Sequence, residues 1–355
     1  MNNLDKQYLD LLNHILQNGR VKGDRTGTGT KSVFGYTIRH NMSDGFPMLT
    51  SKKVYFKGVA EELLWFLKGS TNIQELAQKQ VNIWNGDAYK NFCTKFDHKA
   101  YGWSSDGPMS REEFVKKIKS DDDFAKVWGE LGPVYGSQWR DWGGKKFAFK
   151  MKDINGEEFP DQDDIKGVDQ IQNLINDLRT DPDSRRLMVN AWNVSEIKNM
   201  VLPPCHYVFQ CYTRELTWEE RSALLDTTNG PWDSIARIGT EMDNQNIPKR
   251  AISLKFTMRS VDVPLGLPFN LASYGLLLLM LANEVNMLPE DLIFSGGDCH
   301  IYLNQIDGIK KQIEQETFDL PKVEISKKSI FDIQFEDIKL IGYKSSESIK
   351  IPLSN

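Results

Sequence analysis

The sequence has few of the residues that hold metals or disulfide frameworks. Its 355 residues include four cysteines and five histidines, and a chain this long does not need cross-links to stabilise a core. No Cys-x-x-Cys pair occurs, which makes a metal site the weaker interpretation. The candidates for such a site would be Cys205, His206, Cys211, Cys299 and His300. We therefore expect no metal, and a reducing compartment.

The sequence also lacks a membrane-spanning segment and an excess of positive charge. Its longest apolar run, residues 276–282, is far shorter than the roughly 20 residues that cross a bilayer. The first residues show no basic segment followed by an apolar one. A net charge of −5 disfavours a nucleic-acid-coating surface, so an anionic ligand has to be bound by local arginines. We expect a cytoplasmic protein that needs neither membrane nor nucleic acid.

Helical and strand-like segments are mixed along the chain. Residues 59–72 contain an apolar helix that Gly69 stops, and residues 271–285 read as a second apolar helix. Residues 186–193, 206–213 and 253–260 have the composition or alternation of strands. The order lacks the βαβ rhythm of a parallel sheet. The pattern predicts an α+β fold around an antiparallel or mixed sheet.

Three stretches have a different composition from their surroundings. Residues from about 90 to 128 and 145 to 166 are charged, and their apolar residues show weak periodicity. The third stretch, from about 214 to 252, separates two predicted strands that would otherwise form a hairpin. We interpret them as insertions within one domain that spans residues 1–355, and no chemistry can be assigned to them.

The segment LPPCHYVFQCYT, residues 202–213, contains the strongest candidate nucleophile. Pro203 and Pro204 fix two φ angles directly before Cys205, so the approach of the thiol is set. The alternative is packing, since free cysteine is among the most buried residue types. A reactive thiolate needs a nearby cation. His206 is adjacent, but neighbouring side chains of a strand point to opposite faces, so an arginine is the better candidate.

Arginines occur in three places that suit an anion. Arg25 lies in the glycine-rich GDRTGTGT, Arg185 and Arg186 lie in DPDSRR, and Arg259 precedes Ser260 in MRSVD. Guanidinium groups match phosphate geometry because they donate two parallel hydrogen bonds. Each alone is more often a surface charge, and the glycine loop lacks the Gly-Lys-Ser/Thr of a P-loop. Together they predict a small phosphorylated substrate.

Further polar residues stand out in apolar surroundings. Glu62 interrupts the apolar helix at residues 59–72. Asn270 is either the N-cap of the next apolar helix or a carboxamide that matches the N–H and carbonyl edge of uracil. His300 and Tyr302 in GGDCHIY share one face if this segment is a strand.

These residues lie in eight blocks that together resemble the thymidylate synthase family, folate-dependent enzymes that act on deoxyuridylate. The blocks are DRTGTGT, FPMLTSKK, EELLWFLKGSTN, ELGPVYGSQWRDWG, DPDSRRLMVNAWN, LPPCHYVFQCY, RSVDVPLGLPFNLASY and GGDCHIY. They follow the family order from about Tyr8 to Tyr343, and this collinearity makes the resemblance specific. It implies a large twisted sheet with helices on one face and an obligate homodimer formed through the other.

The resemblance also implies a role for each site residue. Cys205 would add to carbon 6 of dUMP, so that carbon 5 attacks the one-carbon unit of the cosubstrate 5,10-methylenetetrahydrofolate. Glu62, with His206 and water, would relay protons, and Tyr135 would hold the water that removes the carbon 5 proton. The implied catalytic set is Cys205, Glu62, Tyr135, His206, Arg259 and Asn270.

The implied binding residues fall into groups by the part of the ligand that they contact. Phosphate would be bound by Arg25, Arg259 and Ser260, and by Arg185 and Arg186 from the partner subunit. Asn270 would bind the uracil edge, and His300 and Tyr302 the deoxyribose hydroxyl. The implied folate contacts are Lys52, Ile83, Trp84, Leu202 and Asp262.

Three departures from the family pattern bear on the last step. Asp87 replaces a usual tryptophan, Met258 replaces a usual glutamine, and the chain ends IKIPLSN instead of in an apolar tail. An exocyclic methylene at carbon 5 can take hydride, giving dTMP and dihydrofolate, or water, giving 5-hydroxymethyl-dUMP and tetrahydrofolate. Trp84 and Leu202 favour hydride, whereas Asp87 and the polar tail favour water. We expect a thymidylate synthase; a dUMP hydroxymethylase is the alternative, and a catalytically silent nucleotide-binding regulatory protein is a third.

Overall fold

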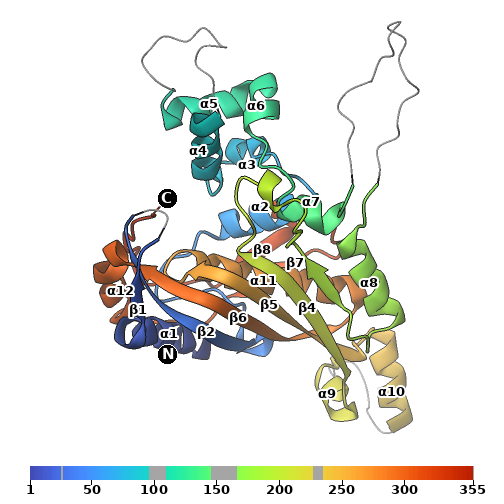
Figure 1. Ribbon diagram of the computed structural model, residues 1–355. Coiled ribbons are helices and arrows are strands. Elements are labelled where there is room, and N and C mark those ends of the chain that lie inside the picture. The colour runs from blue at the N-terminus through green and yellow to red at the C-terminus, as the bar shows by residue number, and fades with distance from the viewer. Residues whose placement is uncertain (25–26, 96–108, 145–165, 227–234, 355) are drawn as a thin grey trace, which may run out of the picture. The chain divides into compact units, whose positions relative to one another are not determined.

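The computed structural model describes residues 1–24, 27–95, 109–144, 166–226 and 235–354 (Figure 1). The chain divides into two compact units. The first, called the sheet unit here, comprises Met1–Val54, Ile175–Leu187 and Phe209–Pro352. The second, the helical unit, comprises Tyr55–Leu174, Met188–Val208 and Leu353–Asn355. The prediction of one domain with three insertions stays a prediction.

A six-stranded sheet has the strand order β1-β2-β6-β5-β4-β3. Its strands are β1 (Arg20–Lys22), β2 (Thr30–Asn41), β3 (Met188–Asn190), β4 (His206–Glu215), β5 (Arg250–Asp262) and β6 (Leu288–Tyr302). β2 is antiparallel to β1 and β6, whereas β5 and β6 are parallel. The sheet is therefore mixed, and the predicted α+β class is confirmed. A second, antiparallel pair joins β7 (Lys322–Ile325) to β8 (Ile338–Ile341).

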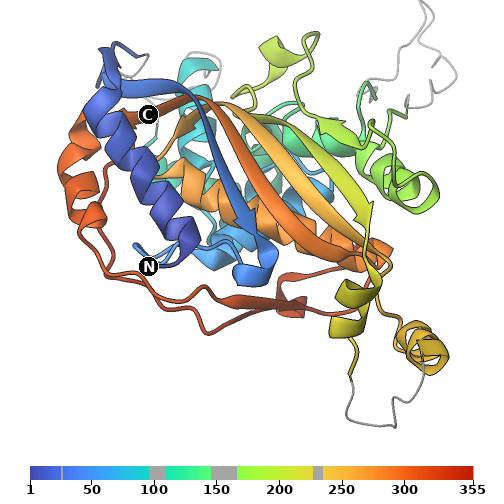
Figure 2. The same cartoon turned by 90° about the horizontal axis from the view of Figure 1, so that it is seen from below.

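Helices α1 (Asn3–Asn18) and α11 (Gly266–Val285) cover one face of this sheet, α1 against β2 and α11 against β5 and β6 (Figure 2). The ring of Tyr274 on α11 stacks on that of Phe256 on β5, with centroids 4.3 Å apart. Gly275 is required by close packing, because a Cβ there would lie 2.2 Å from Cγ of Pro47. In the described part of the chain, α11 alone is long and apolar enough to cross a membrane, but 67% of that window is buried, as in a core helix.

The N-terminal helix is fixed by a buried carboxylate. Asp5 is fully buried and accepts hydrogen bonds from the backbone N–H groups of Thr50, at 3.0 Å, and Ser51, at 2.9 Å. Asn2 caps the same helix by accepting from the Asp5 N–H. These bonds hold the segment that leads to Lys52. The sheet unit also contains α12 (Ile306–Ile313).

The helical unit is built from short helices. They are α2 (Phe56–Leu67), α3 (Gln74–Gln78), α4 (Asn85–Lys95), α5 (Arg111–Ser120), α6 (Asp122–Trp128) and α7 (Tyr135–Arg140), and α8 (Gln170–Thr180) begins in this unit. α2 ends at Leu67, directly before the predicted stop at Gly69, which has a φ of +73°. Short 3₁₀ helices span Met42–Asp44, Ile197–Asn199, Leu303–Gln305 and Phe335–Asp337.

The stretch predicted as the first insertion has a core of its own. Phe92 of α4, Phe114 of α5 and Trp128 of α6 pack together, with ring centroids 5.2 Å apart for the phenylalanine pair and 5.0 Å apart for Phe92 and Trp128. A few buried aromatic residues on short helices give little apolar periodicity, which explains why the sequence did not predict these helices. Residues 96–108 and most of the second predicted insertion, 145–165, lie outside the described residues.

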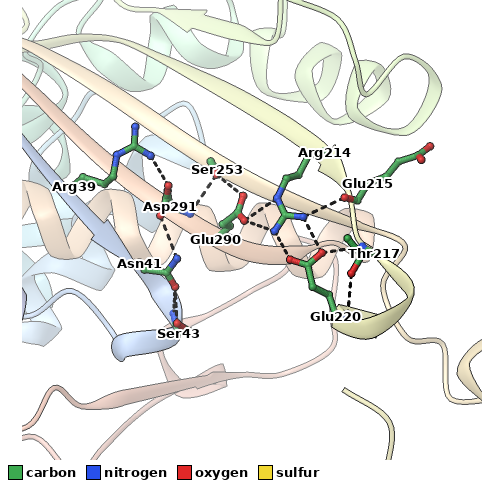
Figure 3. Close-up of polar contacts among 10 residues, drawn as sticks. All are labelled: Arg39, Asn41, Ser43, Arg214, Glu215, Thr217, Glu220, Ser253, Glu290 and Asp291. Atoms are coloured by element: carbon green, nitrogen blue, oxygen red, sulfur yellow. Dashed lines mark hydrogen bonds and ion pairs between the residues drawn. The ribbon is translucent and has the colours of Figure 1, made fainter. Parts of the chain in front are cut away.

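The third predicted insertion carries α9 (Trp218–Ala223) and α10 (Ile235–Asn244). A charged network joins its start to the sheet, as Figure 3 shows. The guanidinium of Arg214 donates to Glu220 on α9, at 2.6 Å, and to Glu290 on β6, at 2.8 Å. The hydrogen bonds from Arg214 lower the pKa of Glu220 to about 2. Alongside, Asp291 accepts from Asn41 and Arg39, so the network extends across to β2.

Candidate active site

The predicted site residues divide between the two units. The helical unit holds Glu62, Ile83, Trp84, Tyr135, Leu202, Cys205 and His206. The sheet unit holds Lys52, Arg185, Arg186, Arg259, Ser260, Asp262, Asn270, His300 and Tyr302. Arg25 lies outside the described residues.

Cys205 lies directly before β4, with its backbone held in place. Its N–H donates to the hydroxyl of Tyr135, the first residue of α7, at 2.7 Å. Pro204 is buried, while Cys205 is only partly buried. The two prolines and the tyrosine restrict the backbone on either side of the thiol. This arrangement suits a nucleophile that has to meet a substrate atom from one direction.

The ring of His206 stacks on that of Tyr135, with centroids 4.1 Å apart and an interplanar angle of 18°. Phe66 packs on both rings, at 6.0 Å and 4.9 Å. Burial lowers the pKa of His206 to about 3, so the imidazole is neutral near pH 7. A neutral ring cannot supply the positive charge that a thiolate needs, but it can pass on a hydrogen bond.

Glu62 on α2 has the properties of a group that exchanges protons near neutrality. Burial raises its pKa to about 7, against the opposing effect of a hydrogen bond from Trp84. That bond runs from Nε1 of Trp84 to Oε1 of Glu62 and is 2.8 Å long. Trp84 is itself buried against Trp65 and Tyr135. A pKa close to the working pH is what general acid–base catalysis requires.

The preceding carboxylate, Glu61, has a different environment. It is buried and accepts from the ammonium of Lys79 at 2.7 Å. This ion pair links α2 to the residue that follows α3. The two adjacent glutamates therefore differ in their partners: Glu61 forms an ion pair with Lys79, whereas Glu62 accepts a hydrogen bond from the indole of Trp84. Sequence reasoning singled out Glu62 and missed the pair.

In the sheet unit, the parallel register of β5 and β6 brings two groups of predicted residues together. Ser260 lies opposite Asp298, and Asp262 lies opposite His300. The rings of His300 and Tyr302 lie on one face, 5.4 Å apart in an edge-to-face arrangement, as the period of two predicts. Sequence reasoning missed Asp298, whose carboxylate lies 3.4 Å from Nδ1 of His300.

Asn270 is not the N-cap of the apolar helix, so that interpretation is wrong. Helix α11 begins at Gly266, and the side-chain amide of Asn270 donates to the Gly266 carbonyl at 2.9 Å, within the helix. Pro268 in the first turn is compatible with this early start, since its missing N–H has no partner there anyway. One edge of the carboxamide is thus used by the helix, and its oxygen has no partner among the described residues.

Lys52 and Asp262 are held by contacts within the sheet unit. The buried ammonium of Lys52 donates to the Pro264 carbonyl at 2.5 Å, and burial lowers its pKa to about 8. Burial raises the pKa of Asp262, which accepts from Gln305 and from the Leu265 N–H, each at 3.1 Å. Their expected contacts with folate stay predictions.

Arg185 and Arg186 follow α8 and are both exposed. Neither has an ion-pair partner within the part of the chain that the structure describes. By contrast, Asp183, which lies in the same turn as these two arginines, pairs with Arg250. The charges of Arg185 and Arg186 are therefore available to a ligand or to another chain.

Two of the cysteines weighed for a metal site are core residues. Burial raises the pKa of Cys211 and of Cys299 to about 12, so both remain protonated thiols, which are poor metal ligands. Among the described residues there is no group of three or more side chains that could hold a metal ion.

The residues that depart from the family pattern have ordinary positions. Met258 is buried in β5, on the same face of the strand as Phe256. Asp87 lies in the first turn of α4, where a carboxylate interacts favourably with the helix dipole.

Comparison with known proteins shows the family of the chain. A sequence model described as thymidylate synthase matches residues 6–355. The chain is 39% identical to thymidylate synthase of Mesoplasma florum, over 97% of this chain and 98% of the relative. It is 38% identical to the Listeria innocua enzyme, over 98% and 99%, and 39% identical to that of Mycoplasma genitalium, over 95% and 96%. With nearly complete coverage in both directions, the chain belongs to the thymidylate synthase family.

Proposed function

We propose that this protein converts dUMP and 5,10-methylenetetrahydrofolate to dTMP and dihydrofolate. Relatives that carry the name thymidylate synthase align along almost the whole chain. The observation that carries the proposal is within the helical unit, where the backbone of Cys205 is fixed by Tyr135 and the pKa of Glu62 is raised to about 7. A directed thiol and a carboxyl group that titrates near neutrality are what the reaction needs.

The chemistry follows from these groups. The Cys205 thiolate adds to carbon 6 of the uracil ring, and carbon 5 becomes nucleophilic toward the one-carbon unit. Glu62, with the neutral His206 and water, relays protons to the ring, and Tyr135 orients the water that takes the carbon 5 proton. Loss of the carbon 5 proton breaks the bond between the one-carbon unit and the folate nitrogen, which leaves an exocyclic methylene at carbon 5. Hydride from the released tetrahydrofolate then reduces this methylene to a methyl group, and the Cys205 thiolate leaves carbon 6, which gives dTMP and dihydrofolate.

The sheet unit supplies substrate binding in this proposal. Arg25, Arg259 and Ser260 bind the phosphate, and His300 and Tyr302 bind the deoxyribose hydroxyl. The free oxygen of Asn270 accepts from the uracil N–H. Folate contacts come from Lys52, Ile83, Trp84, Leu202 and Asp262.

The protein acts as a homodimer in this proposal, with Arg185 and Arg186 reaching the phosphate of the partner's site. Both are exposed and unpaired within the described residues. The face of the sheet that α11 leaves open supports an interface, because Tyr212 is 66% exposed on β4, whereas Phe209 and Cys211, which alternate with it, are buried. Aromatic residues such as tyrosine are enriched at protein–protein interfaces.

A cytoplasmic location belongs to the same proposal. All four cysteines are free thiols, as expected in a reducing compartment.

One experiment separates this function from the two alternatives. Purified protein is incubated with dUMP and 5,10-methylenetetrahydrofolate, and the nucleotide product is analysed by mass while dihydrofolate absorbance is followed. We expect a methyl product and a rise in dihydrofolate. A hydroxymethyl product without dihydrofolate would show a dUMP hydroxymethylase, a name that none of the relatives given above carries. Binding of dUMP without exchange of the carbon 5 proton would show a silent nucleotide-binding protein.

A further inference from the structure

The turn that carries Arg185 and Arg186 is held by residues outside it. It spans residues 181–186, directly after α8, and within it the N–H of Ser184 donates to the Asp181 carbonyl at 3.0 Å. Both arginines are exposed, and a long exposed side chain binds a ligand weakly unless its backbone is fixed beforehand. The turn lies in the sheet unit, as do all the residues that contact it below.

Strand β4 fixes the end of this turn. The side-chain amide of Gln210 donates to the Arg185 carbonyl at 3.3 Å, and the N–H of Cys211 donates to the Leu187 carbonyl at 2.8 Å. Cys211 and Leu187 are both buried, so this end of the turn is part of the core. Two anchors at one end leave the beginning of the turn free to pivot, and the beginning therefore needs contacts of its own.

Thr213 and Arg250 supply those contacts. The hydroxyl of Thr213, a residue of β4 that is 4% exposed, donates to the Pro182 carbonyl at 2.6 Å. Arg250, the first residue of the neighbouring strand β5, donates to the same hydroxyl from Nε at 3.2 Å and from Nη2 at 3.1 Å. A hydroxyl has a single proton, so the bonds from Arg250 leave that proton for Pro182. Arg250 thus orients the hydroxyl that holds the turn.

The same guanidinium also binds the carboxylate of Asp183. Nη2 of Arg250 donates to Oδ1 of Asp183, and the Arg250 side chain is 15% exposed, whereas that of Asp183 is 74% exposed. The cation is therefore fixed on the strand and the anion belongs to the turn, so that the ion pair holds the turn against β5. It also engages a carboxylate that lies three positions before Arg186, where it would compete with a phosphate for that guanidinium.

We propose that Arg250, through Thr213 and Asp183, positions this turn so that Arg185 and Arg186 are presented to the substrate phosphate. The inference rests on the proposed function, in which these two arginines bind phosphate. Arg250 and Thr213 do not touch the ligand, so both are positioning residues. They are 37 positions apart, on either side of most of the third predicted insertion. The two strands that this insertion connects thus hold the turn from its two sides.

The test compares dUMP binding and turnover in three variants of the full chain. Arg250→Gln removes the guanidinium, and Thr213→Val removes the hydroxyl with no change of charge. Lys249→Gln is the control, because it removes an equal charge from the adjacent residue, which is exposed and pairs with Asp243 instead. We expect the dissociation constant of dUMP, measured by calorimetry, and KM to rise about fivefold in Arg250→Gln and about threefold in Thr213→Val. In both, kcat should stay within about twofold of the wild type, and Lys249→Gln should bind dUMP like the wild type.

A second background shows whether the effect passes through the two arginines. The double variant Arg185→Ala, Arg186→Ala lacks the groups that Arg250 positions, so adding Arg250→Gln to it should not weaken dUMP binding further. Should Arg250→Gln fail to fold, as judged by circular dichroism, Thr213→Val replaces it in both backgrounds. An equal loss of affinity in both backgrounds, an equal loss in Lys249→Gln, or unchanged affinity in Arg250→Gln would each overturn the proposal.

The fate of this inference can be told apart from that of the proposed function. A protein that forms dTMP, and whose affinity for dUMP is the same in Arg250→Gln, would overturn the role of Arg250 alone. A protein that forms 5-hydroxymethyl-dUMP would overturn the proposed function alone, because both reactions start from the same bound phosphate. A wild-type protein that does not bind dUMP would overturn both.

Discussion

Cys205 combines two properties that a single cysteine seldom has together. Its backbone is restricted by the two preceding prolines and by the hydrogen bond to Tyr135, and its side chain is partly accessible. The two cysteines within strands of the sheet, Cys211 and Cys299, are buried thiols with raised pKa values. The contrast with these two buried thiols supports the proposal that Cys205 is the nucleophile.

Replacing this thiol should separate binding from turnover. In Cys205→Ser, we expect kcat to fall by at least about a thousandfold, because a hydroxyl at neutral pH is a far weaker nucleophile than a thiolate. The dissociation constant of dUMP, measured by calorimetry, should change only a few-fold, since the phosphate and base contacts come from other residues. Activity within tenfold of the wild type would refute the assignment of the nucleophile.

The contact between Trp84 and Glu62 gives a prediction about pH. The indole hydrogen bond stabilises the ionised carboxylate and so lowers a pKa that burial raises to about 7. In Trp84→Phe this stabilisation is lost, so the pKa of Glu62 should rise. The part of the pH profile of kcat that reflects the titration of Glu62 should then move to higher pH by up to about one unit. Trp65→Phe is the control, because its indole donates to the Asn72 carbonyl instead. A shift of the same size in both variants would mean that the bond to Glu62 is not the cause.

The same carboxyl should make stability depend on pH. The pKa of Glu62 rises from 4.5 to about 7 on folding, so the folded state holds its proton more tightly. The contribution of Glu62 to the free energy of unfolding is fully present below pH 4.5 and is lost as the pH rises through about 7. Glu62→Gln removes this loss, and we expect the variant to be more stable than the wild type at pH 8 by about 1–3 kcal/mol, with no gain at pH 5. Urea denaturation at both pH values is the measurement. An equal difference at both would exclude Glu62 as the titrating group.

At the scale of elements, hydrogen bonding and packing decide the features that the sequence predicted least well. The apolar pattern predicted α11 but not its first residue. Gly266 and Pro268 are weak helix formers, and whether they are helical depends on where the preceding strand ends. Helices α5 and α6 were missed, since their buried side is a few aromatic residues within a charged surface. By contrast, the alternation of Leu254, Phe256 and Met258 predicted β5 well, because a strand buried on one face has a strict period of two.

The Arg214 network is the element-scale feature with a measurable effect. Its guanidinium joins the end of β4 to α9 and to β6 (Figure 3). In Arg214→Met, the third predicted insertion loses its anchor, and we expect proteolysis within residues 214–252 to become several-fold faster while kcat stays within about twofold. Lys249→Gln serves as the control, because Lys249 is exposed and pairs only with Asp243 among the described residues, at 3.4 Å. Equal cleavage rates in all three proteins would mean that the network does not hold the insertion.

For the whole molecule, the sequence predicted chemistry better than geometry. Residue types such as the thiol at 205, the carboxyl at 62 and the arginines are visible in eight collinear blocks, whereas the contacts that tune them are not. The partner of Glu62 is 22 positions away in the chain and that of Cys205 is 70 away, and no local pattern carries pairings at such separations. Asp298 was missed for a related reason. Its contact with His300 depends on how the two side chains are oriented, which the sequence does not show.

The proposed dimer has a consequence that only a mixture of two variants can show. Cys205→Ser lacks the nucleophile but keeps Arg185 and Arg186, and the double variant Arg185→Ala, Arg186→Ala keeps the nucleophile but cannot serve its partner. Each should be nearly inactive alone. If the arginines act across a two-fold interface, subunit exchange creates heterodimers in which one of the two sites has both an intact Cys205 and intact arginines.

Random exchange at equal concentrations makes about half of all dimers mixed, and each mixed dimer has one working site of two, so activity should recover to about a quarter of the wild-type value. Mixing each variant with itself, under the same mild denaturation and dilution, is the control. If the arginines acted within their own chain, the Cys205 of each site would always accompany the arginines of that same chain. No mixed dimer could then work, and the mixture would stay as inactive as its parents.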